Sequence, residues 1–220
     1  MAIAAVFDID GTLVTFKFDV QGTRRALLEE LSARGFSTDG LGLTSPTQTI
    51  LESAEAQISS GRVAADLDEV RQKLYSILDS FELESVSSAT VFPEALEVIE
   101  RLKAKSVRLA VVSNSGRKAA AEALGRAGLQ GAFEFVLTRE DAGAMKPRPD
   151  GLARAVSILG LPPSRVVYVG DSPYDIAAAK AAGLRVVSIA TGNYTAERLR
   201  KEGADHVILS MSELPGLLGA

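Results

Sequence analysis

The chain of 220 residues contains no cysteine. A disulfide framework and thiolate metal sites are therefore excluded, and a reducing compartment is allowed but not proved. No basic run is present, and the net charge of −4 argues against a nucleic-acid partner. The single histidine, His206, is far in sequence from the acidic motifs described below, so we interpret it as structural.

Long apolar runs are also absent, and no stretch is long enough to span a bilayer. The first residues enter a predicted strand directly and lack the charged segment and cleavage site of a signal peptide. We therefore expect a soluble, cytoplasmic protein with no membrane partner. A hydrophobic fraction of 46% against 24% charged residues is typical of a core-forming chain. The length allows one sizeable domain, or a core with a smaller inserted domain.

The chain opens with an apolar run that ends in two acids. Residues 3–7 are β-branched, aromatic or small, which predicts a buried parallel strand. Asp8, Asp10, Gly11 and Thr12 follow close behind. In open α/β sheets, ligands bind at the carboxyl ends of the strands. The alternative is a strand followed by an ordinary polar turn.

Two later strand-like runs, residues 109–112 and 166–169, also end in polar residues. These are Ser113 and Asn114 after the first run, and Gly170, Asp171 and, four residues later, Asp175 after the second. Lys146 lies between the runs in the stretch MKPRPD. Taken alone, Lys146 would be a surface lysine, and the two acids would be a helix cap and a first-turn charge.

Residues 15–90 carry helical patterns and no convincing strand. Helices are predicted over 22–34, from Pro46 through Ile58, and over 67–78. A loop rich in glycine and hydroxyl side chains is predicted over 37–49, and a hinge near 85–89. The sequence therefore predicts an inserted, all-helical cap domain at 15–90.

From residue 91 onward, strands and helices alternate. Strands are predicted at 107–112, 133–137, 166–169, 186–189 and 207–209, and helices at 93–102, 118–127, 149–159, 173–182, 195–202 and the C-terminus. Alternation predicts βαβ units and a doubly wound parallel sheet. The fold class is thus α/β, with residues 1–14 and 91–220 forming the Rossmann-like core domain.

The stretches DIDGT, Ser113, KPRPD and GDSPYD resemble, in order, the four motifs of the haloacid dehalogenase superfamily of phosphatases and related enzymes. They span Asp8 to Asp175. The resemblance implies a central Asp8 strand flanked by the Ser113 and Asp171 strands. The helical insert and the C-terminal part resemble those of phosphoglycolate phosphatase-like members.

The resemblance implies a role for each motif residue. Asp8 would be the nucleophile that forms an aspartyl-phosphate, and Asp10 the general acid and base. Ser113 would bond a phosphoryl oxygen, and Lys146 would neutralise charge. A Mg²⁺ cofactor would be held by Asp8, Asp171 and the Asp10 carbonyl, with Asp175 acting through the ligand shell.

Other residues are expected to contact the substrate. These are Thr12 and Asn114 beside the motifs, and Thr44, Thr47 and Gln48 in the cap loop. Three cations just past motif residues either touch substrate or are solvated surface charges: Arg117, Lys118 and Arg148.

The leading hypothesis is a Mg²⁺-dependent phosphatase acting on a small phosphorylated metabolite, as a monomer or homodimer. The carboxylate of Asp10 argues against the dehalogenases and phosphonate hydrolases of the superfamily. One alternative is a sugar-phosphate mutase, whose relatives carry a histidine soon after the first motif, whereas residues 15–30 contain none. A second is a non-catalytic metal-binding regulatory module, although all motif positions are intact. Two departures bear on phosphoglycolate as substrate: Val14-Thr15-Phe16 replace an acidic-serine pair, and the cap loop lacks an arginine.

Overall fold

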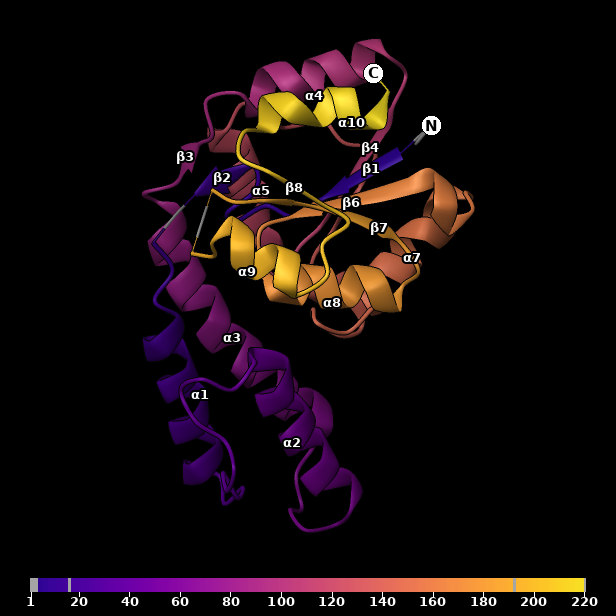
Figure 1. Ribbon diagram of the computed structural model, residues 1–220. Helices are drawn as coiled ribbons and strands as arrows, with labels where there is room; N and C mark the ends of the chain where they lie inside the picture. Colours follow the sequence, from indigo (N-terminus) through magenta and orange to yellow (C-terminus); the bar gives the residue numbers. More distant parts are fainter. Residues whose placement is uncertain (1–3, 16, 192, 220) are drawn as a thin grey trace. The chain divides into compact units, whose positions relative to one another are not determined.

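The computed structural model describes residues 4–15, 17–191 and 193–219 (Figure 1). The chain forms two compact units. One is the segment Lys17–Ser87, and the other comprises residues 1–16 and 88–220. The assignment of residues 15–90 as a separate cap domain stays a prediction, with limits two and three residues away from those of the smaller unit.

Six parallel strands form the sheet of the larger unit, in the order β5-β4-β1-β6-β7-β8. They are β1 (Ala4–Phe7), β4 (Arg108–Val112), β5 (Val136–Leu137), β6 (Val166–Gly170), β7 (Arg185–Ile189) and β8 (His206–Ile208). Phe7 is paired with Val111 of β4 on one side and with Val169 of β6 on the other. The α/β class and the central position of the first strand are thereby confirmed. Ile3, the first residue of the predicted strand, lies outside the described residues.

Helices cover both faces of this sheet, with α4 and α10 on one side and α7, α8 and α9 on the other (Figure 1). The helices of this unit are α4 (Ala95–Ala104), α5 (Arg117–Arg126), α6 (Arg139–Ala142), α7 (Asp150–Leu159), α8 (Pro173–Ala181), α9 (Ala196–Lys201) and α10 (Leu214–Leu218), and 3-10 turns occupy Pro163–Arg165 and Met211–Glu213. Ala4 and Val6 of β1 pack in one cluster with Leu152 of α7 and Ile176 of α8. The alternate residues, such as Phe7, are also buried, so the apolar strands reflect burial on both faces.

The smaller unit contains α1 (Val20–Ala33), α2 (Thr47–Ser59) and α3 (Leu67–Val86). Asp19 and Asp66 cap α1 and α3, because each carboxylate accepts a hydrogen bond from a backbone N–H three residues ahead at 2.8 Å. Buried leucines at helical spacing, such as Leu27 and Leu31, form the apolar face of α1. Within the described ranges, no helix combines the length and apolarity needed to cross a bilayer.

Four details differ from the sequence predictions. The strand predicted at 133–137 is limited to Val136–Leu137. β2 (Val14–Thr15) pairs antiparallel with β3 (Thr90–Val91), so the prediction of helices only over 15–90 was wrong at its two ends. Strands of two residues are too short to show an alternating pattern. The loop before α2 ends at Pro46, which places Thr47 and Gln48 in the first turn of the helix. The one-turn helix α6 was also not predicted, since four residues carry no helical period.

Candidate active site

Two carboxylates meet at the carboxyl ends of neighbouring strands. Asp8 directly follows β1, and its backbone N–H donates to the Val169 carbonyl of β6 at 2.9 Å. Asp171 directly follows β6. Asp175, on the first turn of α8, joins them, and carboxylate oxygens of the three acids lie within 4.8 Å of one another. All three side chains are buried, so the parallel sheet concentrates negative charge at one place.

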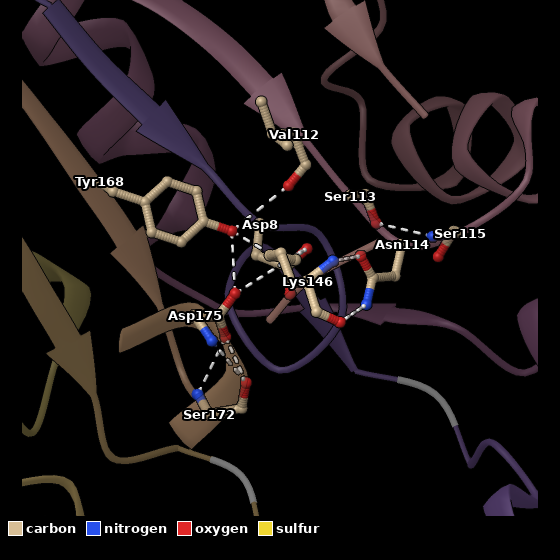
Figure 2. A network of polar contacts seen from close by, with 9 residues as sticks. All are labelled: Asp8, Val112, Ser113, Asn114, Ser115, Lys146, Tyr168, Ser172 and Asp175. Atoms are coloured by element: carbon tan, nitrogen blue, oxygen red, sulfur yellow. Dashed lines mark hydrogen bonds and ion pairs between the residues drawn. The ribbon is translucent and has the colours of Figure 1, made fainter. Parts of the chain in front are cut away.

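Lys146 brings the positive charge into this cluster (Figure 2). Its Nζ lies 2.8 Å from Asp8 Oδ1 and 2.6 Å from Asp175 Oδ1, and it donates to the Tyr168 hydroxyl at 2.8 Å. Burial lowers the pKa of Lys146, but the negative charges of Asp175 and Asp8 raise it by more than burial lowers it. The pKa of Lys146 is therefore above its ordinary value. The side chain is therefore a cation at every physiological pH.

Asp175 uses both carboxylate oxygens within the protein. Oδ1 accepts from Lys146 and from the Tyr168 hydroxyl, and Oδ2 accepts from the Ser172 N–H and hydroxyl at 3.0 and 2.6 Å. Burial raises the pKa of Asp175, but Lys146 and the hydrogen bonds from Ser172 and Tyr168 lower it below its ordinary value. A Cβ on Gly170 would lie 2.5 Å from the Asp175 carboxyl carbon, so only glycine fits beneath this side chain.

For Asp8 and Asp171, burial outweighs the interactions that favour the ionised form. Burial raises the pKa of Asp8 to about 6, although Lys146 opposes the effect. Burial, then the charges of Asp175, Asp8 and Asp10, raises the pKa of Asp171 to about 9. Three buried acids therefore face one ammonium, and their oxygens are the hard donors that Mg²⁺ prefers. The chemistry of the donor set fits a divalent cation held by Asp8 and Asp171.

The turn after β1 carries Asp10, Gly11 and Thr12. Asp10 is partly exposed, and its charge acts on Asp171. Gly11 has φ +73°, and a Cβ there would lie 2.2 Å from the Asp171 carboxylate, so this position requires glycine on both counts. Thr12 is fully buried, and its hydroxyl has no hydrogen-bond partner among the described residues. Its predicted contact with substrate stays a prediction.

Ser113 and Asn114 follow β4. Ser113 is buried, and its Oγ accepts from the Ser115 N–H at 3.2 Å. The Asn114 amide pairs at two points with the backbone of Lys146: it donates to the carbonyl at 3.0 Å and accepts from the N–H at 2.8 Å (Figure 2). The amide predicted to contact substrate is thus used to hold Lys146.

The predicted cap-loop residues lie in the helical unit. Thr44 is exposed, and the Arg24 guanidinium of α1 donates to the neighbouring Leu43 carbonyl at 2.8 Å. Thr47 is partly buried in α2. Gln48 is buried, and its amide donates to Glu52 at 3.2 Å. The hydroxyl of Thr44 is therefore the most accessible group of the three.

Sequence reasoning missed two buried polar residues. Tyr168 bonds both Lys146 and Asp175, and the only signal was a hydroxyl in an otherwise aliphatic strand. Arg139 is 1% exposed, and its guanidinium donates to the Asn114 carbonyl at 3.2 Å. Nothing in the local pattern distinguishes this arginine from a surface cation.

The remaining cations differ in their surroundings. Arg117 is 66% exposed and pairs with Asp141 at 2.9 Å, which fits a solvated charge. Lys118 and Arg148 are also largely solvent-accessible, and Arg148 lies 3.7 Å from Asp150. His206 is exposed on the edge strand β8, paired with Val187, and its structural role stays a prediction.

The part of the chain that carries the motifs matches a known protein family. The family model of haloacid dehalogenase-like hydrolases matches residues 4–183. The chain belongs to this family. This haloacid dehalogenase-like hydrolase is therefore an enzyme, and its named relatives include phosphatases.

Relatives of this haloacid dehalogenase-like hydrolase match it over nearly its full length. The phosphoglycolate phosphatase of Rhodospirillum rubrum is 31% identical, with 100% of this chain and 92% of that protein covered. A phosphoglycolate phosphatase of Cupriavidus necator is 30% identical, covering 98% and 92%. The crystal structure of a HAD-family hydrolase from Deinococcus radiodurans R1, with bound phosphate and sodium, has a TM-score of 0.63 and 25% identity, covering 99% and 95%.

Proposed function

We propose that this hydrolase is a Mg²⁺-dependent phosphatase that cleaves a small phosphorylated metabolite through an aspartyl-phosphate on Asp8. The observation that carries the proposal is the buried Lys146 ammonium, 2.8 Å from Asp8, inside a carboxylate cluster at the end of the central strand. A phosphate monoester is anionic, so its transfer depends on positioning and charge neutralisation. Lys146 supplies one fixed positive charge for that purpose.

A bound Mg²⁺ would supply the second positive charge and reduce the repulsion between the phosphoryl group and the acids. Asp8 and Asp171 would hold it, together with the Asp10 carbonyl that the family pattern implies. Asp175 would stay behind this shell, because four hydrogen bonds within the protein already occupy its oxygens.

The chemistry then proceeds in two transfers. A carboxylate oxygen of Asp8 bonds to phosphorus as the bond from phosphorus to the ester oxygen breaks, and Asp10 protonates that leaving oxygen. Water then gives a proton to Asp10 while its oxygen attacks phosphorus, and the bond to Asp8 breaks to release inorganic phosphate. Ser113 would donate to a phosphoryl oxygen during both steps. Asn114 would act by holding the Lys146 backbone.

The similarity to phosphoglycolate phosphatases makes phosphoglycolate the first substrate to test. The two sequence departures, at residues 14–16 and in the cap loop, favour a panel of small phosphorylated metabolites over a single compound. The test is phosphate release by the purified chain, with and without Mg²⁺, from a generic aryl phosphate and from the panel. Mg²⁺-dependent release is expected. If a sugar phosphate were isomerised with no net release of phosphate, the protein would be a mutase, and if neither reaction occurred, the phosphatase proposal would fail.

A further inference from the structure

The hydroxyl of Tyr168 lies among the groups that surround Lys146. The Tyr168 side chain is fully buried, and its ring belongs to the apolar cluster between the sheet and α7 and α8. Its hydroxyl extends from β6 toward the catalytic end of the sheet, where it meets Lys146, Asp175 and the Val112 carbonyl (Figure 2). A phenylalanine would fill the same apolar space, so packing alone does not require the hydroxyl.

The hydrogen bonds around Lys146 are complete only with this hydroxyl. An ammonium has three N–H donors, and Lys146 faces three oxygens: Asp8 at 2.8 Å, Asp175 at 2.6 Å and Tyr168 at 2.8 Å. The phenolic oxygen accepts from Lys146, and its own proton goes to Asp175 at 2.9 Å, with the Val112 carbonyl more distant at 3.3 Å. Burial and the charges of Asp175 and Asp8 raise the pKa of Tyr168 well above its ordinary value, so this proton is retained.

The position of Tyr168 in the sheet gives the contact a geometric consequence. β4 and β6 are the two neighbours of β1, which ends in Asp8. The Tyr168 hydroxyl belongs to β6 and reaches Val112, the last residue of β4 before Ser113. It therefore lies within reach of both strands that flank the nucleophile, and its oxygen accepts from the Lys146 ammonium at 2.8 Å.

We propose that Tyr168 is a positioning residue whose hydroxyl holds the Lys146 ammonium against Asp8. The proposal rests on the phosphatase function proposed above. Tyr168 does not touch substrate in this scheme and acts through Lys146, because its oxygen accepts a hydrogen bond from the Lys146 ammonium. Without the hydroxyl, one N–H of Lys146 loses its acceptor, and the ammonium can turn away from the line of phosphoryl transfer.

Tyr168→Phe tests this role because it removes one oxygen and keeps the ring. We expect kcat to fall by about ten- to a hundredfold, as when a group near the reacting centre is displaced, with little change in KM or in the Mg²⁺ midpoint. Tyr174→Phe is the matched control, since it removes a hydroxyl from the adjacent segment and should keep wild-type kcat. Unchanged kcat in Tyr168→Phe would overturn the proposal.

A double-mutant cycle separates positioning from a general structural effect. In a Lys146→Ala background, Tyr168→Phe should cause no further loss of residual turnover, because its effect passes through Lys146. Additive losses in the two variants would mean that the hydroxyl acts independently of Lys146, which contradicts the proposal.

A crystal structure of Tyr168→Phe supplies a readout that does not depend on turnover. The Lys146 Nζ is expected to move away from Asp8 while the backbone of β6 and α8 stays in place. If the wild-type protein released no phosphate, the proposed function would fail, and this structure would still decide the positioning role. An unmoved Lys146 Nζ would refute it.

Discussion

Asp8 experiences opposing influences at the end of β1. Burial raises its pKa to about 6, and the Lys146 ammonium at 2.8 Å works in the other direction. Near neutral pH the side chain is therefore mostly a carboxylate, which is the form that can attack phosphorus. The same lysine holds the carboxylate of Asp8 in one orientation through the contact at 2.8 Å.

Asp8→Asn should abolish turnover in a folded protein. The amide keeps the shape of the side chain but cannot form an acyl-phosphate, so kcat is expected to fall by at least about a thousandfold. Phosphate release by the purified variant checks this, with circular dichroism to confirm folding. Near-normal turnover by a preparation free of wild-type enzyme would remove Asp8 as the nucleophile.

Asp171→Ala should raise the Mg²⁺ concentration needed for half-maximal activity by about tenfold or more, because a charged oxygen ligand is lost. The fold should change little, since Asp171 follows the last residue of β6 and caps no helix. A Mg²⁺ titration of activity gives the midpoint. A variant with the wild-type midpoint would take Asp171 off the list of metal ligands.

At the scale of elements, strong periodicity made most of the fold predictable. The buried strands β1, β4 and β6 read as continuous apolar runs, and their polar ends located Asp8, Ser113 and Asp171. The family resemblance supplied the strand order, which alternation alone cannot give. The two-residue strands β2 and β3 and the single turn of α6 were missed because they are shorter than any period.

Site residues that directly follow a strand could be predicted from the sequence. Contacts between site residues that are far apart in the sequence could not. The two-point pairing of Asn114 with the Lys146 backbone joins positions 32 residues apart, which no local pattern reveals. Tyr168 lies inside a strand, where an aromatic residue is expected for packing, so its hydroxyl was only a weak signal of a polar role. Such contacts depend on how segments far apart in the sequence pack together.

Substrate choice can be tested in the segment before α2 and in the first turn of that helix. In the proposed function the core motifs bind the phosphoryl group, so we expect groups outside the core to recognise the rest of a substrate. We expect the double variant Thr44→Ala and Thr47→Ala to change the ranking of good substrates and to leave hydrolysis of a generic aryl phosphate nearly intact. Gln48 is left unchanged because it is buried and bonded to Glu52.

The matched control for this loop replaces Ser76 and Ser80 by alanine. Both carry hydroxyls on α3 that donate to carbonyls of their own helix, so they resemble Thr44 and Thr47 in chemistry and differ from them in position. Specificity constants across a metabolite panel are the measurement. If both double variants kept the wild-type ranking, the segment before α2 would be only a connection.

At the scale of the whole molecule, the crowded acids connect stability to pH. The pKa of Asp8 rises from 3.8 to about 6 and that of Asp171 from 3.8 to about 9 on folding. Between pH 3.8 and about pH 9 the folded chain therefore binds more protons than the unfolded chain, and its stability falls as pH rises. Asp175 acts in the opposite direction only below 3.8, and Lys146 affects stability only above 10.5.

In EDTA, the free energy of unfolding should therefore decrease from pH 5 to pH 9 by on the order of 1 kcal/mol or more, since one pKa unit corresponds to about 1.4 kcal/mol. Mg²⁺ should flatten this decrease, because it favours the ionised acids. Urea unfolding at several pH values measures the effect, and Asp171→Asn is the control that should lose most of it. A metal-free stability that rose over this interval would contradict the assigned directions.

The short antiparallel pairing of β2 with β3 has a consequence for the evolution of such a protein. Thr15 and Thr90 are paired across it, so the ends of the helical segment leave the core about 5 Å apart. The entropy cost of closing such a loop grows only slowly with the length of the segment, by about 0.6 kcal/mol for each doubling. The pairing of β2 with β3 therefore holds the two ends of the helical segment at a fixed spacing. We therefore expect that a helical segment of another length could replace this one without disturbing the register of β1, β4 and β6.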